Sequence, residues 1–192
     1  HCMSYAKRNI KINGATFRIV PMITFVAKAF HFSRSNDNRY KGVTKSNLES
    51  IPKRSKVLLS FGEIDCRPTE GFISAAPKLN QPIGDIISST VTGYLQWVAV
   101  QNKILNHNIH FFNVPAPIHD EKYSSEVNTD RANVVKLFNA QMKKQIAVSE
   151  FNIIDVYGFT LGQDGFSNCQ FPIDELHLGA KAIPEIEQQL NS

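Results

Sequence analysis

Short apolar runs rich in β-forming residues alternate along this chain with longer amphipathic segments, and no other feature constrains the fold as strongly. The alternation is typical of a three-layer α/β/α fold, in which helices cover both faces of a parallel sheet. We predict strands at residues 17–20, 56–61, 109–113 and 152–156. Because residues 57–61 are almost continuously apolar, we expect that strand to be buried on both faces and central in the sheet.

Helices are predicted where apolar residues recur at a spacing of three or four positions. Ile183, Ile186 and Leu190 share one face of a helix near the C-terminal end of the chain. Residues 33–44 and 66–82 are polar or rich in proline and glycine, so we expect loops there. The other predicted helices span residues 45–51, 83–106 and 130–149.

The chain has 192 residues, of which 42% are hydrophobic, and this is the size of a single domain spanning residues 1–192. A domain of this length buries roughly 70% of its unfolded surface and needs no cross-links. The cysteines, Cys2, Cys66 and Cys169, are odd in number, far apart and outside any CxxC pattern. They predict free thiols in a reducing compartment, rather than a disulfide framework or a zinc site.

Charge and hydropathy argue against two classes of partner. The net charge is only +4 and the basic residues are scattered, whereas nucleic-acid binding favours a dense basic stripe. No apolar run reaches the ~18 residues of a membrane span. The first residues also lack the basic and apolar regions of a secretory signal. We therefore expect a cytoplasmic protein that binds neither nucleic acid nor membranes.

A polar block, Gly62-Glu63-Ile64-Asp65-Cys66-Arg67, follows the predicted strand at 56–61. Ligands of doubly wound sheets bind at the carboxyl ends of strands. If the chain continues in an extended conformation, the side chains of Glu63, Asp65 and Arg67 lie on one side. The alternative is a strand-ending turn in which the charges face solvent, or in which Arg67 pairs with Asp65 or Glu63 and serves the architecture alone.

A second polar block, Asp174-Glu175-Leu176-His177, lies near the end of the chain. A carboxylate three positions before a histidine can orient that histidine and stabilise its charged form, as a general base requires. The alternative is that Asp174 caps a helix and His177 lies in its first turn.

Together the two blocks resemble the SGNH hydrolase superfamily, also called GDSL-type hydrolases, and in particular its intracellular members with a Gly-Glu-Ile-Asp-Cys-Arg block. The resemblance covers nearly the whole chain and implies a flavodoxin-like parallel sheet. It also implies a catalytic triad in which Asp174 and His177 match the family's Asp-x-x-His block. The family's nucleophile is the serine of a Gly-Asp-Ser turn that ends the first strand.

The beginning of the chain is the main departure from this pattern. In many relatives the turn reads Gly-Asp-Ser-His and a helix follows, so residues 1–6 resemble the segment after the serine. We therefore expect the first strand and the nucleophile to lie just upstream of His1. Ser4 is a poor substitute, because it is displaced by about one helical turn, ~6 Å, from the strand end. If the native chain began at His1, the enzyme hypothesis would fail.

The oxyanion hole also differs from the family's pattern. The family uses an asparagine where this chain has Ile64, whose side chain cannot donate a hydrogen bond. Arg67 is an alternative donor. A backbone amide near Lys28 could replace that of the family's glycine-containing loop. The candidate substrate and oxyanion residues are thus Gly62, Glu63, Asp65, Arg67 and Lys28.

The resemblance implies a serine-dependent acyl-ester hydrolase or acyltransferase that acts on a small-molecule or glycan ester. No metal or organic cofactor is expected, since His107, His110 and His119 lack carboxylates at metal-ligand spacing. One alternative is a non-catalytic binding domain that keeps the fold, which Ile64 and the absent serine would favour. A flavodoxin-like nucleotide binder is a weaker alternative, because the chain lacks a glycine-rich phosphate loop.

Overall fold

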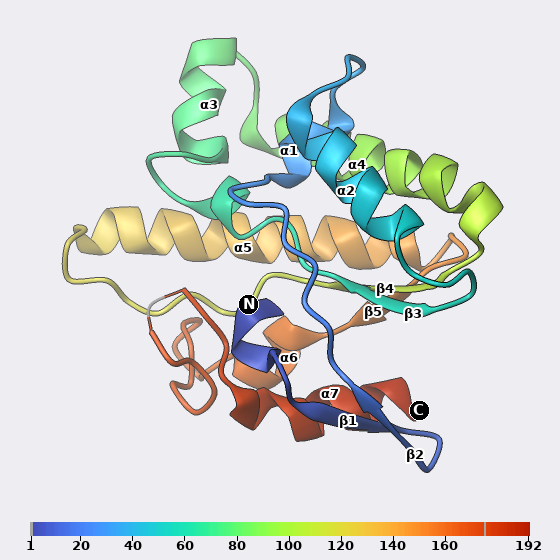
Figure 1. Ribbon diagram of the computed structural model, residues 1–192. Helices are drawn as coiled ribbons and strands as arrows, with labels where there is room; N and C mark the ends of the chain where they lie inside the picture. The colour runs from blue at the N-terminus through green and yellow to red at the C-terminus, as the bar shows by residue number, and fades with distance from the viewer. Residues whose placement is uncertain (1, 175) are drawn as a thin grey trace.

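The computed structural model describes residues 2–174 and 176–192 and shows a mixed α/β fold (Figure 1). Its parallel sheet consists of β3 (Lys56–Leu59), β4 (Asn108–Phe112) and β5 (Asn152–Ile154), in that order. The register pairs Leu58 with His110 and Phe111 with Ile153. The prediction of a parallel sheet at these three segments is therefore confirmed.

The central strand of the described sheet is β4, so the prediction that residues 57–61 form the central strand is wrong for this part of the chain. Within the described residues, β3 pairs with β4 alone. An apolar run shows that both faces of a strand are covered, but it carries no information about neighbours at the edges. The position of β3 thus could not be read from its composition.

The side chains of the sheet alternate between two separate hydrophobic clusters, as the period of a strand requires. Leu59, Ile109 and Phe111 belong to one cluster, which includes residues of α4 (Ile83–Leu105) and α5 (Ser125–Ile146). Phe112 and Ile154 belong to the other cluster, which includes residues of α7 (Ile183–Leu190). Figure 1 shows α1 to α5 on one side of the sheet, and α6, α7 and a β-hairpin on the other.

Two helices lie in segments that the sequence predicts to be loops. Helix α2 (Arg39–Glu49) begins inside residues 33–44, because the Asn38 side chain accepts the N–H groups of Tyr40 and Lys41 and so caps it. Helix α3 (Phe72–Leu79) occupies part of residues 66–82 and contains Pro77. Helix α5 also begins earlier than the predicted residue 130, and the Ser124 side chain, which accepts the N–H of Val127, caps it.

The first part of the chain forms η1 (Cys2–Tyr5) and an antiparallel hairpin of β1 (Asn9–Ile12) and β2 (Ala15–Arg18). The strand predicted at 17–20 is therefore wrong as a member of the parallel sheet. The short helix α1 (Ala29–Ser33) follows, after a segment in which Val20, Phe25 and Val26 are exposed.

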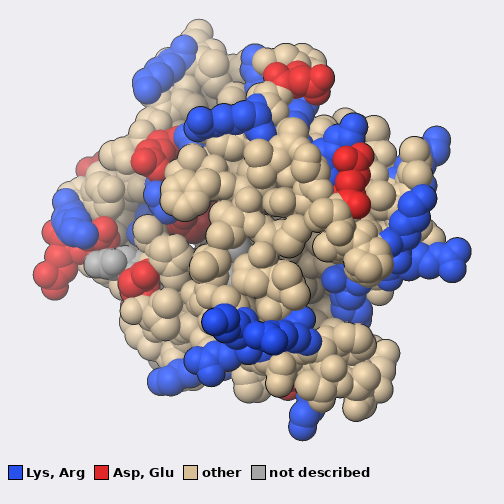
Figure 2. All heavy atoms as spheres, viewed as in Figure 1, with Lys and Arg blue, Asp and Glu red and all other residues tan. Residues whose placement is uncertain are grey.

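On the face drawn in Figure 2, lysine and arginine side chains lie at several separate places around a broad area without charged groups.

The remaining elements are η2 (Ile64–Cys66), α6 (Val156–Thr160) and η3 (Ala180–Ala182). Pro184 lies in the first turn of α7, where its missing N–H is harmless, so the helix needs no kink. Across the described residues, none of the helices combines the length and the apolar character needed to traverse a lipid bilayer.

Candidate active site

The loop before η3 holds Asp174 against His177. Two backbone hydrogen bonds close this loop, from Ile173 N to His177 O and from Gly179 N to Phe171 O, each 2.8 Å long. Asp174 Oδ1 accepts the N–H groups of Leu176 and His177 at 2.8 and 2.7 Å. Its Oδ2 lies 2.8 Å from His177 Nδ1. Because residue 174 and residues 176–178 are not helical, Asp174 closes a side-chain turn and does not cap a helix.

This pair has the geometry that a general base needs. The side chains of His177 and Asp174 are 47% and 44% exposed, so both can be reached from solvent. Partial burial works to raise the pKa of Asp174, but the N–H groups of Leu176 and His177 and the imidazole outweigh it and lower that pKa. The ionised carboxylate therefore favours the tautomer with the proton on Nδ1, which makes Nε2 the basic nitrogen.

The block that follows β3 is not extended, which corrects the prediction that Glu63, Asp65 and Arg67 lie on one side. Residues Ile64–Cys66 form η2, a single turn that places Glu63 and Arg67 together. Arg67 donates to both carboxylate oxygens of Glu63 at 2.8 to 3.2 Å, and to Glu70 at 3.2 Å. Its guanidinium is thus occupied by two carboxylates, as the architectural alternative requires.

Asp65 is buried and connects η2 to the beginning of α1. Its two oxygens accept the N–H groups of Ala29 and Phe30 at 2.7 and 3.0 Å. Burial raises the pKa of Asp65 to about 6, although these two hydrogen bonds act in the opposite direction. Beside it, Lys28 donates its backbone N–H to His31 and its ammonium to the Glu70 carbonyl. Asp65 and Lys28 therefore make contacts that position the turn.

Gly62 marks the point where the chain leaves β3. Its φ of +123° is strongly disfavoured for residues with a side chain. A Cβ at this position would also lie 2.6 Å from a ring carbon of Phe138. The glycine is therefore required by backbone conformation and by close packing on α5.

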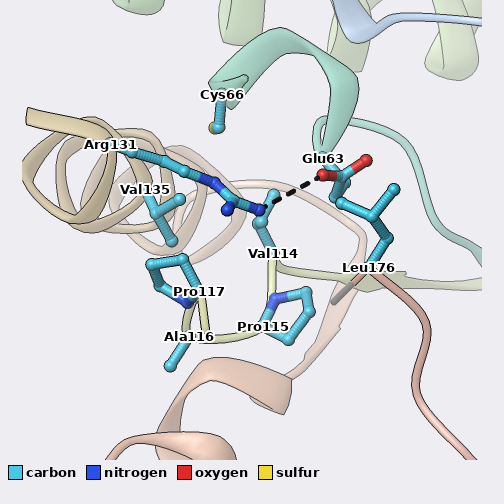
Figure 3. Close-up of a pocket in the computed structure, with 9 residues that line it drawn as sticks. All are labelled: Glu63, Cys66, Val114, Pro115, Ala116, Pro117, Arg131, Val135 and Leu176. Atoms are coloured by element: carbon cyan, nitrogen blue, oxygen red, sulfur yellow. Dashed lines mark ion pairs between the residues drawn. The ribbon is translucent and has the colours of Figure 1, made fainter. Parts of the chain in front are cut away.

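Two adjoining pockets bring the two polar blocks together at the carboxyl ends of the strands. They share Pro115, Ala116 and Leu176, so Glu63 in the first pocket lies next to the part of the loop that carries His177 in the second. Gly62, Asp65, Arg67 and Lys28 line neither pocket. The first pocket (Figure 3) is lined by Glu63, Cys66, Val114, Pro115, Ala116, Pro117, Arg131, Val135 and Leu176. The second is lined by Pro115, Ala116, Ile118, Thr160, Ser167, Pro172, Asp174, Leu176, His177 and Leu178.

Sequence reasoning missed several polar side chains that shape these pockets. Asn139 on α5 accepts the N–H of Val114 at 2.8 Å and donates to its carbonyl at 2.7 Å, which fixes the chain after β4. Arg131, also on α5, is nearly buried in the wall of the first pocket. No motif marks either residue, and a polar side chain in an amphipathic helix normally faces solvent.

Cys66 lines the first pocket but is not a plausible nucleophile. It is buried, and desolvation together with the nearby charges of Asp65 and Glu63 raises the pKa of its thiol well above the ordinary value. A thiol, not a thiolate, is therefore present at neutral pH, and the thiol is the unreactive form.

The beginning of the chain packs close to the loop that carries His177. Tyr5 in η1 and Leu178 belong to the same hydrophobic cluster. Ser4 is among the lining residues of neither pocket. His1, the residue next to the expected nucleophile, lies outside the described residues. No group of three or more histidine, cysteine, aspartate or glutamate residues in the described chain is placed to hold a metal ion.

Comparisons with known proteins show no family for this chain. No family model matches the sequence, and no curated protein matches it. Among solved structures, phospholipase A1 from Streptomyces albidoflavus NA297 is similar with a TM-score of 0.47 and 14% sequence identity, over 77% of this chain and 74% of that one. A similarity this distant identifies neither family nor activity, so the functional conclusion depends on the site itself.

Proposed function

We propose that this chain forms most of an SGNH-type acyl-ester hydrolase or acyltransferase, with His177 as general base and Asp174 as the residue that orients it. The observation that supports this proposal is the exposed Asp174–His177 pair, with its 2.8 Å bond, in a pocket at the carboxyl ends of the strands. The three-layer, flavodoxin-like arrangement of that superfamily belongs to the same proposal.

The nucleophile in this proposal is a serine at the end of a strand that precedes residue 1. Such a strand would pair with the edge of β3 that has no partner among the described residues. The proposal is supported by Tyr5 of η1, which belongs to the same hydrophobic cluster as Leu178, the residue after His177.

The chemistry follows from the tautomer of His177. Its Nε2 takes the proton of the serine hydroxyl as the serine oxygen attacks the acyl carbon and forms a tetrahedral oxyanion. The imidazolium, stabilised by Asp174, then returns the proton to the leaving alcohol, and an acyl-enzyme remains. Water or an acceptor alcohol, deprotonated by the same nitrogen, releases the acyl group and regenerates the serine.

The oxyanion donors in this proposal are backbone groups near Gly62. The N–H groups of Gly62 and Glu63 donate to no acceptor in the described part of the protein. Ile64 has no polar side chain, and the guanidinium of Arg67 is held by two carboxylates. Preorganised backbone N–H groups are the usual means of stabilising such an oxyanion.

The test uses the natural full-length chain, including any residues before His1. We expect a serine-reactive fluorophosphonate to label one serine and the protein to hydrolyse p-nitrophenyl acetate, or to transfer its acetyl group to a sugar alcohol. Substitution His177→Ala should abolish both the labelling and the turnover. A folded full-length protein that shows neither labelling nor turnover would refute the proposal.

A non-catalytic binding domain is the second candidate. It is favoured by Ile64, which occupies the position of the oxyanion asparagine, and by the internal pairing of Arg67. The two functions differ in what precedes residue 1 in the gene. An apolar strand that ends in Gly-Asp-Ser supports the enzyme, and any other upstream sequence supports the binding domain.

A further inference from the structure

Arg131 is the least exposed charged group in the wall of the first pocket. It lies on α5, and only 7% of its side chain is exposed, compared with 18% for Glu63. Figure 3 shows its guanidinium directed from α5 into the space between Val114, Cys66 and Glu63. The arginine therefore points toward the pocket instead of extending to the surface.

The guanidinium of Arg131 has no hydrogen-bond acceptor among the described residues. Its nearest carboxylate oxygen, Oε1 of Glu63, lies 3.8 Å from Nη2, which is too far for a hydrogen bond. Glu63 is already engaged by Arg67 at 2.8 to 3.2 Å. A guanidinium has five N–H donors, and those of Arg131 are not among the fully enclosed unpaired polar atoms of the described residues, so they remain accessible from the pocket.

We infer that the first pocket binds a carboxylate, with the guanidinium of Arg131 as its anchor. A carboxylate is planar and can accept two parallel N–H bonds from an arginine. The apolar walls formed by Val114, Pro117 and Val135 exclude water and so strengthen this interaction. They also offer apolar contacts to a short aliphatic group attached to the carboxylate.

The charge of Glu63 selects among anions. Its carboxylate stands beside Arg131, so each added negative charge on the ligand is repelled. A second charge on the ligand doubles both this repulsion and the attraction to Arg131, but the cost of removing an ion from water grows with the square of its charge. A monoanionic carboxylate is therefore desolvated against Val114, Pro117 and Val135 at a lower cost than a phosphate dianion. The pocket therefore favours carboxylate over phosphate.

The neighbouring pocket extends this inference to the substrate. The two pockets share Leu176, so a molecule with its carboxylate on Arg131 can place an ester beside His177. The substrate class is then an acyl ester that also carries a free carboxylate. This extension rests on the proposed function, whereas carboxylate binding at Arg131 does not.

Carboxylate binding is measured by titrating the folded chain with propionate and, separately, with inorganic phosphate, followed by chemical-shift changes of backbone amides. We expect propionate to bind more tightly than phosphate, and Arg131→Gln to weaken propionate binding at least about tenfold. The matched control is Arg39→Gln, which removes an exposed arginine on α2 and should leave the affinity unchanged. Unchanged propionate binding by folded Arg131→Gln, or tighter binding of phosphate, would overturn the inference.

A second variant keeps the test decisive if Arg131→Gln fails to fold. Substitution Glu63→Gln removes the repelling charge beside Arg131, so propionate binding should become several-fold tighter. Weaker or unchanged binding in this variant contradicts the inference. The titration needs no turnover, so its failure and the failure of the proposed hydrolase are distinguishable: loss of activity in His177→Ala tests the enzyme, and propionate binding tests Arg131.

Discussion

Two polar segments meet at the same end of the sheet and use the same kinds of residue in opposite ways. In the turn after β3, Asp65 is 1% exposed and binds two backbone N–H groups of α1, while Glu63 and Arg67 bind one another. In the loop before η3, the side chains of Asp174 and His177 bind one another but remain nearly half exposed. The first segment positions the chain, and the second presents groups to solvent.

The pKa values of the two aspartates show the same difference. Burial raises the pKa of Asp65 to about 6. At Asp174 burial also acts to raise the pKa, but the hydrogen bonds from Leu176 and His177 and the charge of His177 together outweigh it and lower that pKa. A carboxylate that must stabilise an imidazolium has to stay ionised, so it needs the exposed, hydrogen-bonded environment of Asp174 and not the buried environment of Asp65. The comparison teaches that exposure and partners, not residue type, separate a structural carboxylate from a chemical one.

The largest effect is expected from His177→Ala in the full-length protein. Loss of the proposed general base should lower kcat by about 10³-fold or more, while the free energy of unfolding changes by less than about 0.5 kcal/mol. Ester hydrolysis and urea unfolding measure the two quantities. His119→Ala is the control, since His119 is exposed and has no carboxylate partner among the described residues, and it should retain activity. An active His177→Ala protein would remove the loop from the chemistry.

A large loss of stability is expected from Gly62→Ala in the turn. The new Cβ would require a disfavoured φ and would overlap Phe138, so we expect the free energy of unfolding to fall by about 3 kcal/mol. Gly14→Ala is the matched control, because Gly14 also has a positive φ but no atom within 4 Å of its Cβ position. It should lose only about 1 kcal/mol. Equal losses in urea unfolding would contradict the role of close packing.

The buried carboxylate of Asp65 predicts a pH dependence of stability. Its folded-state pKa of about 6 exceeds the ordinary value of 3.8, so the folded protein binds the proton more tightly than the unfolded chain. The contribution of Asp65 to stability is therefore fully present below pH 3.8 and is lost as the pH rises through 6. Relative to Asp65→Asn, the wild type should lose about 2 kcal/mol between pH 4.5 and pH 7.

Urea unfolding of both proteins at the two pH values measures this change. The difference between them isolates Asp65 from the other titrating groups, which both proteins share. If the difference in the free energy of unfolding between the two proteins stays constant or grows with pH, burial does not raise the pKa of Asp65.

The smallest effect is expected from Glu70→Gln at the exposed rim of the turn. Glu70 pairs with Arg67 at 3.2 Å, but 51% of its side chain is exposed, so solvent screens the pair. The free energy of unfolding should fall by less than about 0.5 kcal/mol, and 0.5 M NaCl should remove the difference. A loss above 1 kcal/mol would show that the turn depends on this outer pair.

Local patterns predicted a substantial part of this molecule. The helix predicted at residues 83–106 is present as α4, and strands predicted at 56–61, 109–113 and 152–156 overlap β3, β4 and β5. The bond between Asp174 and His177 also follows from their separation of three residues, which a single turn can close. Such features depend on neighbours in the sequence, and periodicity and turn chemistry report on them.

The order of residues along the chain is thus enough to indicate an α/β chain with a carboxylate–histidine pair near its C-terminal end. Only the tertiary structure decided that β4 lies between its neighbours, that Asp65 is buried against α1, and that Arg131 faces a pocket. These outcomes depend on contacts between segments far apart in the sequence. Local patterns cannot report them, because the same pattern of residues fits a solvent-facing turn or helix equally well until another element packs against it.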